Sequence, residues 1–254
     1  MSSGSVAILG LGPGDPAQRT PEVEAALAVA TDLIGYFPYV DRIPDRPGLR
    51  RHASDNRVEL DRARHALQLA AVGARVAVVS GGDAGVFAMA SAVFEAVEHG
   101  EASWRALDIQ VLPGISAMFA AAARVGAPLG HDFCAISLSD NLKPWAVIEQ
   151  RLRAVAVAGF VIALYNPLSR ARPWQLGAAL ELLRQALPGD VPVVFATAVT
   201  RPDERITILP LRDADPALAD MRTLVMIGSA ATRVLERPGG MRPWVYSPRG
   251  IASS

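Results

Sequence analysis

Short apolar, β-branched runs alternate with longer stretches rich in Ala, Leu and Arg along almost the whole chain. The runs at residues 6–11 and 75–80 are each followed by a turn rich in glycine and then by a helical pattern. Strands that alternate with helices predict βαβ units, in which parallel strands form a sheet with helices on its faces. The sequence therefore predicts an α/β fold.

The first half of the chain reads as one α/β domain with a parallel sheet. Thr20 can cap a helix that has Pro21 at its first position. A polar loop is expected between the second strand and residue 54. The expected strands are 6–11, 33–35, 75–80 and 107–112, and the expected helices are 20–30, 56–72, 84–98 and 116–125.

The second half keeps the alternation but has fewer helical crossovers between its strands, which favours a mixed sheet. We place the domain boundary near residues 128–130, which gives an N-terminal domain 1–129 and a C-terminal domain 130–254. The tail after Gly239 is rich in Pro and Ser, and we expect it to be loosely held. The expected strands are 133–138, 160–165, 191–198, 205–209 and 223–227, and the expected helices are 145–155 and 173–186.

Composition narrows the class of partner. The 254 residues carry a net charge of zero, which disfavours nucleic acid as a partner. The longest uncharged apolar stretch, residues 154–165, is shorter than the roughly 18 residues that span a bilayer. The N-terminus lacks the pattern of a signal peptide. We therefore expect a cytoplasmic protein without membrane partners.

The metal-ligating residue types are sparse. Cys134 is the single cysteine and lies in an apolar run, so a buried structural thiol is expected rather than a nucleophile. The four histidines, His52, His65, His99 and His131, have no ligand spacing. The sequence therefore predicts no protein-bound metal.

A loop with the sequence Gly-Leu-Gly-Pro-Gly-Asp-Pro, residues 10–16, follows the first strand. Glycines let a backbone turn tightly and approach a ligand closely. The loop differs from the dinucleotide-binding fingerprint because Asp15 stands where the third glycine would fall. A tight turn without a ligand remains the alternative interpretation.

Two further loops repeat this arrangement at residues 80–87 and 112–117. Backbone N–H groups at such a helix start favour anionic groups such as a carboxylate. Asp83 can accept hydrogen bonds from an amine or a hydroxyl, or it can simply cap the helix, and Ser116 can likewise be a cap. Because ligands of open α/β sheets lie beyond the carboxyl ends of the strands, the three loops together predict one ligand site.

In this order and spacing, the three loops resemble those of the tetrapyrrole methylase family. Members are S-adenosylmethionine methyltransferases with two α/β domains and the cofactor in the cleft between them. The resemblance runs from Val6 to about Thr232. Segments 137–145, 163–167 and 200–205, and less tightly 35–39, resemble the branch that methylates precorrin-3B at C17 and contracts the ring to precorrin-4 in cobalamin biosynthesis.

The resemblance implies the residues that contact S-adenosylmethionine and its product S-adenosylhomocysteine. Sister methylases often have Met at the position of Asn166, so this contact departs from the family pattern. The implied contacts are Pro13, Gly81, Gly82, Asp83, Val86, Phe87, Ser116, Ala117, Tyr165, Asn166, Val199 and Thr200. The family also implies a homodimer.

Ring contraction requires a general base, whereas methyl transfer requires mainly in-line positioning. Asp15 is our first candidate base, with capping of its own turn as the alternative. Asn141 and Lys143, beside Asp140, are candidates for polar substrate contacts, or they belong to a solvated loop. Nothing around Lys143 indicates a desolvated amine. Substrate carboxylates predict an arginine cluster, with candidates Arg42, Arg50, Arg51, Arg57, Arg170, Arg172 and Arg201.

Other activities remain open at this point. A sister methylase could act on another precorrin or on the cobalt-containing intermediate, cobalt-factor III. The fold also supports methylation of ribosomal RNA or of a protein side chain. A non-catalytic domain that binds a tetrapyrrole or a cofactor is the alternative from a different class.

Overall fold

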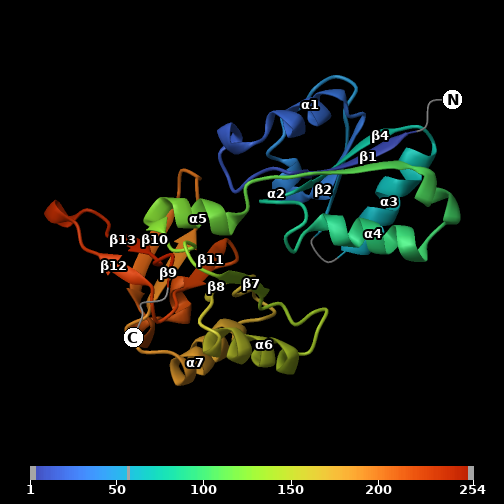
Figure 1. Cartoon of the computed structure of the whole chain (residues 1–254). Coiled ribbons are helices and arrows are strands. Elements are labelled where there is room, and N and C mark those ends of the chain that lie inside the picture. Colours follow the sequence, from blue (N-terminus) through green and yellow to red (C-terminus); the bar gives the residue numbers. More distant parts are fainter. Residues whose placement is uncertain (1–3, 56–57, 251–254) are drawn as a thin grey trace. The chain divides into compact units, whose positions relative to one another are not determined.

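The computed structural model describes residues 4–55 and 58–250, and the chain divides into two units, Met1–Ala117 and Met118–Ser254 (Figure 1). This division lies before the boundary expected near residues 128–130. The reason is the helix α5 (Ala117–Val125), whose residues Met118, Ala121 and Val125 pack in a core of the second unit. A helix belongs to the sheet that buries its apolar side chains.

The first unit contains a sheet of five strands in the order β3-β2-β4-β1-β5, all parallel. This confirms the predicted parallel sheet. Apolar residues on β1 and β4 are buried on both faces, as expected for a sheet covered on both sides. The strands are β1 (Ser5–Gly10), β2 (Asp32–Tyr36), β3 (Arg50–Ser54), β4 (Arg75–Ser80) and β5 (Asp108–Leu112).

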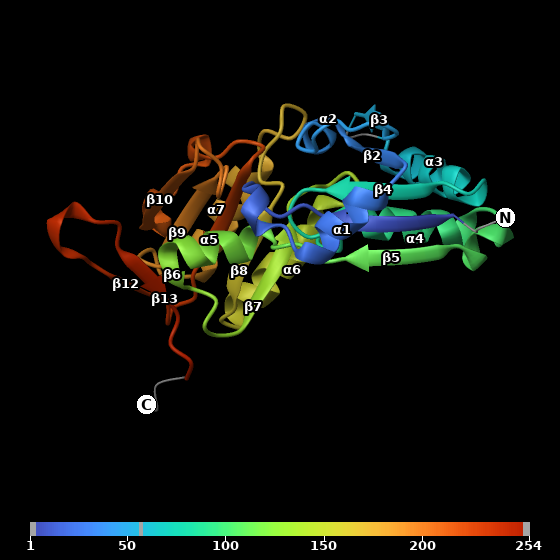
Figure 2. The same cartoon turned by 90° about the horizontal axis from the view of Figure 1, so that it is seen from above.

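Helices cover both faces of this sheet (Figure 2). Ile8 of β1 joins the core under α3 (Glu59–Ala71) and α4 (Met89–His99). Its neighbour Leu9 points to the opposite face, under α1 (Pro21–Val29) and α2 (Phe37–Val40). Successive strand residues face opposite sides, so one strand supplies both cores. Two 3₁₀ turns complete the unit, η1 (Pro16–Gln18) and η2 (Ala102–Ala106).

Several element boundaries differ from those expected. Thr20 caps α1 as predicted, since its Oγ1 accepts a hydrogen bond from the Val23 N–H at 3.2 Å. The expected polar loop before residue 54 contains α2 and the edge strand β3. The expected helix 84–98 begins only at Met89, because Phe87 has a φ of 51° that no helix accommodates. Residues 56–57 of the expected helix 56–72 lie outside the described residues.

The second unit contains a mixed sheet in the order β10-β9-β11-β8-β7, as predicted. β7 and β8 are parallel, whereas the other pairs are antiparallel. Helices α6 and α7 cover one face and α5 the other (Figure 1). The elements are β7 (Phe133–Ser137), α6 (Trp145–Val157), β8 (Val161–Tyr165), α7 (Gln175–Ala186), β9 (Pro192–Thr197), β10 (Arg205–Pro210) and β11 (Thr223–Ile227).

A small second sheet corrects the expectation of a loosely held tail. Strand β13 (Trp244–Tyr246) pairs with β12 (Arg233–Leu235) and with β6 (Gly126–Ala127). Its central residue Val245 is buried, because alternation along a strand turns every second side chain inward. Ser247 Oγ then donates to the Pro128 carbonyl at 2.6 Å. Short 3₁₀ turns lie at Leu211–Asp213 (η3), Pro216–Leu218 (η4) and Pro238–Gly240 (η5).

Among the helices described here, none is both long enough and apolar enough to span a membrane.

Candidate functional site

The three glycine loops meet at the carboxyl ends of β1, β4 and β5. Gly12 and Gly82 exchange two backbone hydrogen bonds, of 3.0 and 2.9 Å. A Cβ atom on Gly10 would lie 2.6 Å from the Gly114 nitrogen and 2.8 Å from the Gly82 carbonyl oxygen, so glycine alone fits there. The predicted convergence of these loops is therefore present in the first unit.

Asp83 joins the second loop to the third. Its Oδ1 accepts a hydrogen bond from the Gly85 N–H at 2.8 Å, and its Oδ2 accepts one from the Gly114 N–H at 3.0 Å. Asp83 does not cap the following helix, because α4 begins only at Met89 and has no side-chain cap, so the helix-cap interpretation is wrong. The contact with Gly114 adds a link between two loops that sequence reasoning missed. A carboxylate offers about four acceptor positions, so Asp83 can also accept hydrogen bonds from a ligand.

Tyr39, in the segment 35–39 that resembles the family, is a further residue at this site that was not among the predicted contacts. Its ring lies against Gly81, where a Cβ atom would come within 2.7 Å of Cε1 of the tyrosine. Tyr36 packs edge-on against the same ring, with centroids 5.6 Å apart. The segment 35–39 therefore lies beside the second glycine loop.

The first loop is fixed by an arginine. Arg42 donates to the carbonyl oxygens of Leu11, Gly12 and Gly14, and its shortest bonds are 3.0, 3.2 and 3.1 Å. Asp15 is exposed and caps η1, because its Oδ1 accepts a hydrogen bond from the Ala17 N–H at 2.9 Å. Arg42 thus holds the loop that presents Asp15.

Four non-glycine residues in the described ranges have a positive φ: Phe87, Asn166, Ala198 and Thr200. Three of them are predicted cofactor contacts, and Ala198 precedes a fourth contact, Val199. Such conformations are uncommon outside glycine and concentrate at ligand sites. Phe87, the last residue of the second glycine loop, is also half exposed. The residues with a positive φ therefore lie in the loops in which the resemblance places the cofactor contacts.

In the second unit, the predicted contacts follow β8 and β9. The Tyr165 hydroxyl accepts a hydrogen bond from the Met118 N–H at 3.2 Å. Asn166 Nδ2 donates to Ser137 Oγ at 3.0 Å, which ties the turn after β8 to the end of β7. Side chains on two neighbouring strand ends therefore hold this turn.

Glu204 holds the turn after β9. Its Oε2 accepts a hydrogen bond from the Thr200 N–H at 2.7 Å and pairs with Arg124 Nε at 3.0 Å. Burial by itself would raise the pKa of Glu204, but the Thr200 hydrogen bond and Arg124 outweigh it and lower the pKa. Glu204 is therefore ionised at neutral pH, and we assign it a positioning role.

The segment 140–143 is anchored in the second unit. Gln175 Nε2 donates to both carboxylate oxygens of Asp140 at 3.1 Å. Lys143 Nζ donates to the Ser139 carbonyl at 3.3 Å, and Asn141 is exposed. Asp140 thus helps to shape the loop, while Asn141 faces solvent.

Lys143 differs from expectation in one respect. Burial lowers the pKa of its amine, and the neighbouring Arg151 lowers it further, against the opposite influence of Asp140. The expected absence of desolvation at this lysine is therefore wrong. No local pattern could reveal it, because the burial comes from the folded loop around the amine.

The arginine candidates largely bind the chain itself. Arg51 donates to the carbonyl oxygens of Val40 and Ile43, and Arg50 pairs with Asp32 at 2.8 Å. Arg172 Nη1 donates to the Asn166 carbonyl at 3.1 Å. With Arg42, four of the seven candidates have such structural contacts, and Arg57 lies outside the described residues.

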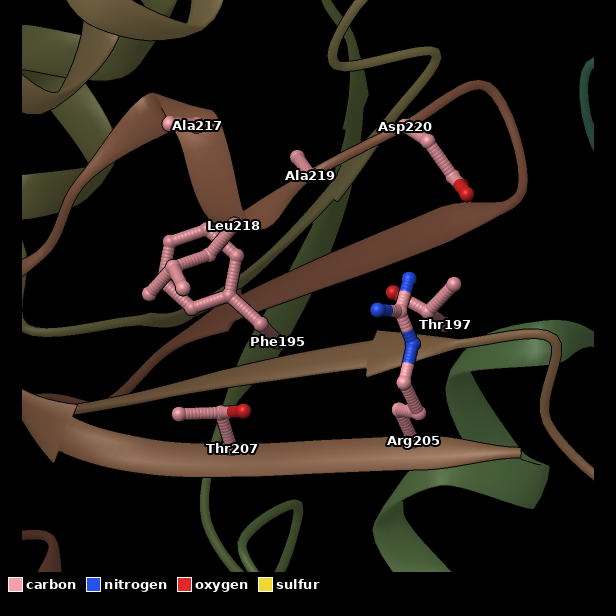
Figure 3. Close-up of a pocket in the computed structure, with 8 residues that line it drawn as sticks. All are labelled: Phe195, Thr197, Arg205, Thr207, Ala217, Leu218, Ala219 and Asp220. Carbon is pink, nitrogen blue, oxygen red and sulfur yellow. The ribbon is translucent and has the colours of Figure 1, made fainter. Parts of the chain in front are cut away.

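A pocket of about 210 Å³ lies on the second unit beside β9 and β10, and Figure 3 shows its lining. None of the predicted cofactor contacts lines it, so we do not assign the pocket to the methyl donor. Within the described ranges, no group of three His, Cys, Asp or Glu side chains could hold a metal ion. The lining residues are Phe195, Thr197, Arg205, Thr207, Ala217, Leu218, Ala219 and Asp220.

Comparison with known proteins gives consistent matches. Residues 5–215 match the family model of the tetrapyrrole (corrin/porphyrin) methylases. A precorrin-3B C(17)-methyltransferase from Sinorhizobium sp is 59% identical over 252 residues, which cover 99% of each chain. The crystal structure of the methyltransferase CobJ has a TM-score of 0.92 and 57% identity, and the match covers 97% of this chain and 100% of that one. A probable cobalt-factor III C(17)-methyltransferase from Salmonella typhimurium is 39% identical over 90% of this chain and 94% of the relative.

Proposed function

Because the chain belongs to the tetrapyrrole methylase family, we propose that it transfers the methyl group of S-adenosylmethionine to C17 of precorrin-3B in cobalamin biosynthesis. The proposed reaction contracts the macrocycle to precorrin-4 and releases S-adenosylhomocysteine. The Sinorhizobium relative that carries this name matches the chain almost from end to end, which supports the assignment.

The observation that carries the proposal is the assembly of the three glycine loops at one sheet edge. Gly10, Gly82 and Gly114 bring the backbones together, and Asp83 ties two of the loops. A ligand with an amine and a carboxylate fits this edge, because Asp83 can accept from the amine and other backbone N–H groups of the loops can donate to the carboxylate. The methionine part of the donor has both groups.

We assign the donor contacts to the loops of both units. Phe87 offers an exposed aromatic face in the first unit. In the second unit, the proposed contacts lie in two turns held in left-handed conformations by Ser137 and Glu204. When bound, the donor supplies an electrophilic methyl group on a good leaving group. The residues then have to position the methyl group rather than activate it.

Ring contraction requires a proton to be removed from a hydroxyl group of the substrate. We propose Asp15 as the base, because its carboxylate is exposed in the loop that follows β1 and its Oδ1 is oriented by the Ala17 N–H. Asn141 and Lys143 are proposed to bind polar groups of the macrocycle. A partly desolvated amine such as Lys143 releases a proton more readily than an exposed lysine, so it suits the role of acid.

We further propose that the enzyme works as a cytoplasmic homodimer without nucleic-acid partners. The family resemblance supports the dimer, and the zero net charge supports the lack of nucleic acid. The second candidate substrate is cobalt-factor III, because the Salmonella relative carries that name. Its lower identity favours the metal-free substrate for this chain.

The proposal is tested by equilibrium binding and by turnover. Purified protein should bind S-adenosylmethionine, add one methyl group to precorrin-3B and shift its absorbance as the ring contracts. Cobalt-factor III, offered in parallel, should react more slowly. Faster reaction of the cobalt form would make the second candidate correct. Failure to bind the donor would overturn the methyltransferase assignment itself.

A further inference from the structure

A second pocket, of about 360 Å³, lies in the first unit between the sheet edge at β3 and helix α3. We call it the edge pocket. None of its lining residues is a predicted cofactor contact or candidate base, so the proposed methyl transfer does not account for it. It is lined by Ile34, His52, Ala53, Ser54, Val58, Asp61, Arg62 and His65.

Arg62 is a buried charge in the wall of the edge pocket, with only 5% of its surface exposed. Its Nε donates to Ser54 Oγ at 2.9 Å, its Nη2 to the Asp55 carbonyl at 2.6 Å and its Nη1 to Met89 Sδ at 3.3 Å. All three acceptors are neutral.

No carboxylate oxygen of the described residues pairs with Arg62 within 4.0 Å. Burial lowers the pKa of the guanidinium, against the more distant influence of Glu59, Asp55 and Tyr39. An arginine nevertheless stays charged at physiological pH. Buried charges in proteins are normally paired with an opposite charge. A bound anion beside this guanidinium would supply that opposite charge.

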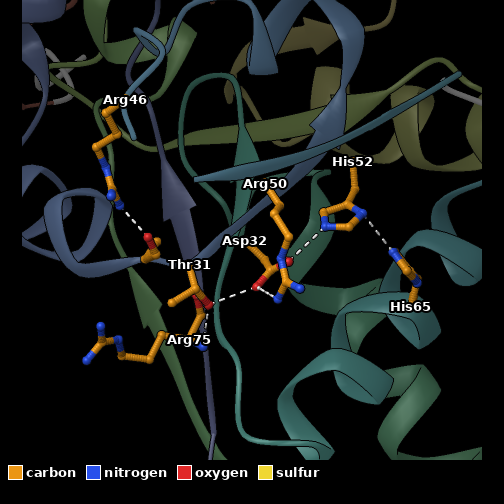
Figure 4. Close-up of polar contacts among 8 residues, drawn as sticks. Thr31, Asp32, Arg46, Arg50, His52, His65 and Arg75 are labelled. Carbon is orange, nitrogen blue, oxygen red and sulfur yellow. Dashed lines mark hydrogen bonds and ion pairs between the residues drawn. The ribbon is translucent and has the colours of Figure 1, made fainter. Parts of the chain in front are cut away.

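His52 and His65 of the edge pocket form a chain of contacts that ends at the buried carboxylate of Asp32 (Figure 4). His52 Nε2 lies 2.9 Å from Asp32 Oδ1, and His52 Nδ1 lies 3.1 Å from His65 Nε2. Burial alone would raise the pKa of Asp32, but hydrogen bonds from Arg50, His52 and Thr31 lower it, so Asp32 is ionised.

An ionised carboxylate can only accept, so His52 donates from Nε2 and, when neutral, accepts from His65 at Nδ1. Burial and the neighbouring His52 lower the pKa of His65, while Asp32 acts in the opposite sense. His65 is therefore neutral at pH 7. Among the described residues of the lining, Arg62 is then the one permanent positive charge, and Asp61 is mostly solvated and paired with Arg64. The single positive charge of Arg62 suits an anion that carries one negative charge.

We propose that the edge pocket binds a short aliphatic carboxylate. The planar guanidinium of Arg62 matches a carboxylate with two parallel hydrogen bonds, and the Ser54 hydroxyl can donate a third. Ile34, Ala53 and Val58 provide an apolar wall for the methylene groups. The carboxylate belongs either to a free small molecule or to a side chain of a larger substrate. The proposal stands whether or not the chain transfers methyl groups.

The test uses the full chain with ¹⁵N-labelled histidines and follows the His65 resonances by NMR. Sodium propionate should shift them saturably, whereas sodium chloride at equal ionic strength should not. A bound carboxylate favours the protonated imidazole, so propionate should also raise the measured pKa of His65. Unchanged His65 resonances throughout the propionate titration would overturn the proposal.

Matched variants separate the edge pocket from nonspecific binding. Arg62→Gln should weaken propionate binding by about tenfold or more, since charged hydrogen bonds are lost, and Ser54→Ala by about three- to tenfold. Arg105→Gln, at an exposed position of the same unit away from the edge pocket, should bind as wild type does. If Arg62→Gln does not fold, Ser54→Ala and Arg62→Lys decide the question. Equal affinity in folded Ser54→Ala and Arg62 variants refutes the assignment.

A second titration identifies the source of the carboxylate. Uroporphyrin, a porphyrin with eight carboxylate side chains, is added in place of propionate. If it shifts His65 at far lower concentration and competes with propionate, the edge pocket takes a substrate side chain. If propionate alone shifts His65, the ligand is a free small carboxylate.

Discussion

The role of Asp15 can be separated from its capping contact, because the chain repeats the same local structure elsewhere. Asp15-Pro16-Ala17 and Asp215-Pro216-Ala217 both begin a 3₁₀ turn. In each, the aspartate Oδ1 accepts a hydrogen bond from the alanine N–H at 2.9 Å. Asp215 therefore serves as an internal control for everything that the cap itself contributes.

The most informative substitution is Asp15→Asn, because it removes the base and keeps the cap. Asparagine caps about as well as aspartate, so the free energy of unfolding should change by less than about 0.5 kcal/mol. A general base typically contributes about 10²- to 10⁴-fold to the rate, and asparagine cannot take up the proton. Ring contraction should therefore slow by that factor, while donor affinity stays within about twofold.

Alanine variants measure the cap itself. Asp15→Ala and Asp215→Ala should each cost about 0.5–2 kcal/mol, which lowers the melting temperature by roughly 1–8 °C in a chain of this size. Asp215→Ala and Asp215→Asn should leave turnover unchanged. Comparing Asp15→Ala with Asp215→Ala therefore shows how much of any lost activity is due to the loss of a cap alone.

The assay is single turnover of precorrin-3B, followed by absorbance for contraction and by mass for methylation. Thermal unfolding and donor binding are measured on the same samples. Contraction at the wild-type rate in Asp15→Asn would refute the role of Asp15 as base. An equal loss in Asp215→Asn would show that the effect is not specific to position 15 and would also refute that role.

Three further predictions concern the packing of glycines, the ionisation of Asp32 and the reactivity of Cys134. Gly10→Ala should lose about 1–3 kcal/mol of stability in urea unfolding, together with donor binding, because its Cβ meets neighbouring backbone. The matched Gly177→Ala inside α7 meets its nearest atom at 3.5 Å and should gain about 0.5–1 kcal/mol. The pKa of Asp32 is lower in the folded protein than in the unfolded chain, where it is about 4. Its ionised form therefore stabilises the fold above about pH 4, and this stabilisation is lost as the pH falls through the folded-state pKa. The acid-induced loss of stability should be smaller in Asp32→Asn, and an unchanged pH profile would contradict this. Partial burial raises the pKa of Cys134 to about 11, so the native thiol should react with a disulfide reagent on the order of 100-fold more slowly than in the denatured chain. A fast reaction of the native thiol would contradict this prediction.

Strands with buried β-branched residues were predictable, because burial on both faces leaves continuous apolar runs such as β4 and β9. The convergence of the glycine loops was predictable for a related reason, since parallel neighbours end at one edge. Strand β3 was not predictable, because its sequence Arg-Arg-His-Ala-Ser is polar and its pairing depends on Asp32 of β2.

The supporting contacts of the site were beyond sequence reasoning for another reason. Arg42 holds carbonyl oxygens 28 to 31 residues earlier in the chain, and carbonyl groups have no signature in a sequence. Asp83 reaches the Gly114 N–H across 31 residues in the same way. The left-handed conformation of Phe87, which delays the start of α4, likewise depends on surrounding structure.

The bonds between the glycine loops have a consequence for the order of events in binding. Gly12 cannot move without breaking its bonds to Gly82, and Gly114 cannot move without releasing Asp83. The conformational entropy of these loops is therefore lost during folding rather than during association. A ligand that reaches this edge meets a rigid, preorganised surface, so its affinity is not reduced by the cost of ordering the loops.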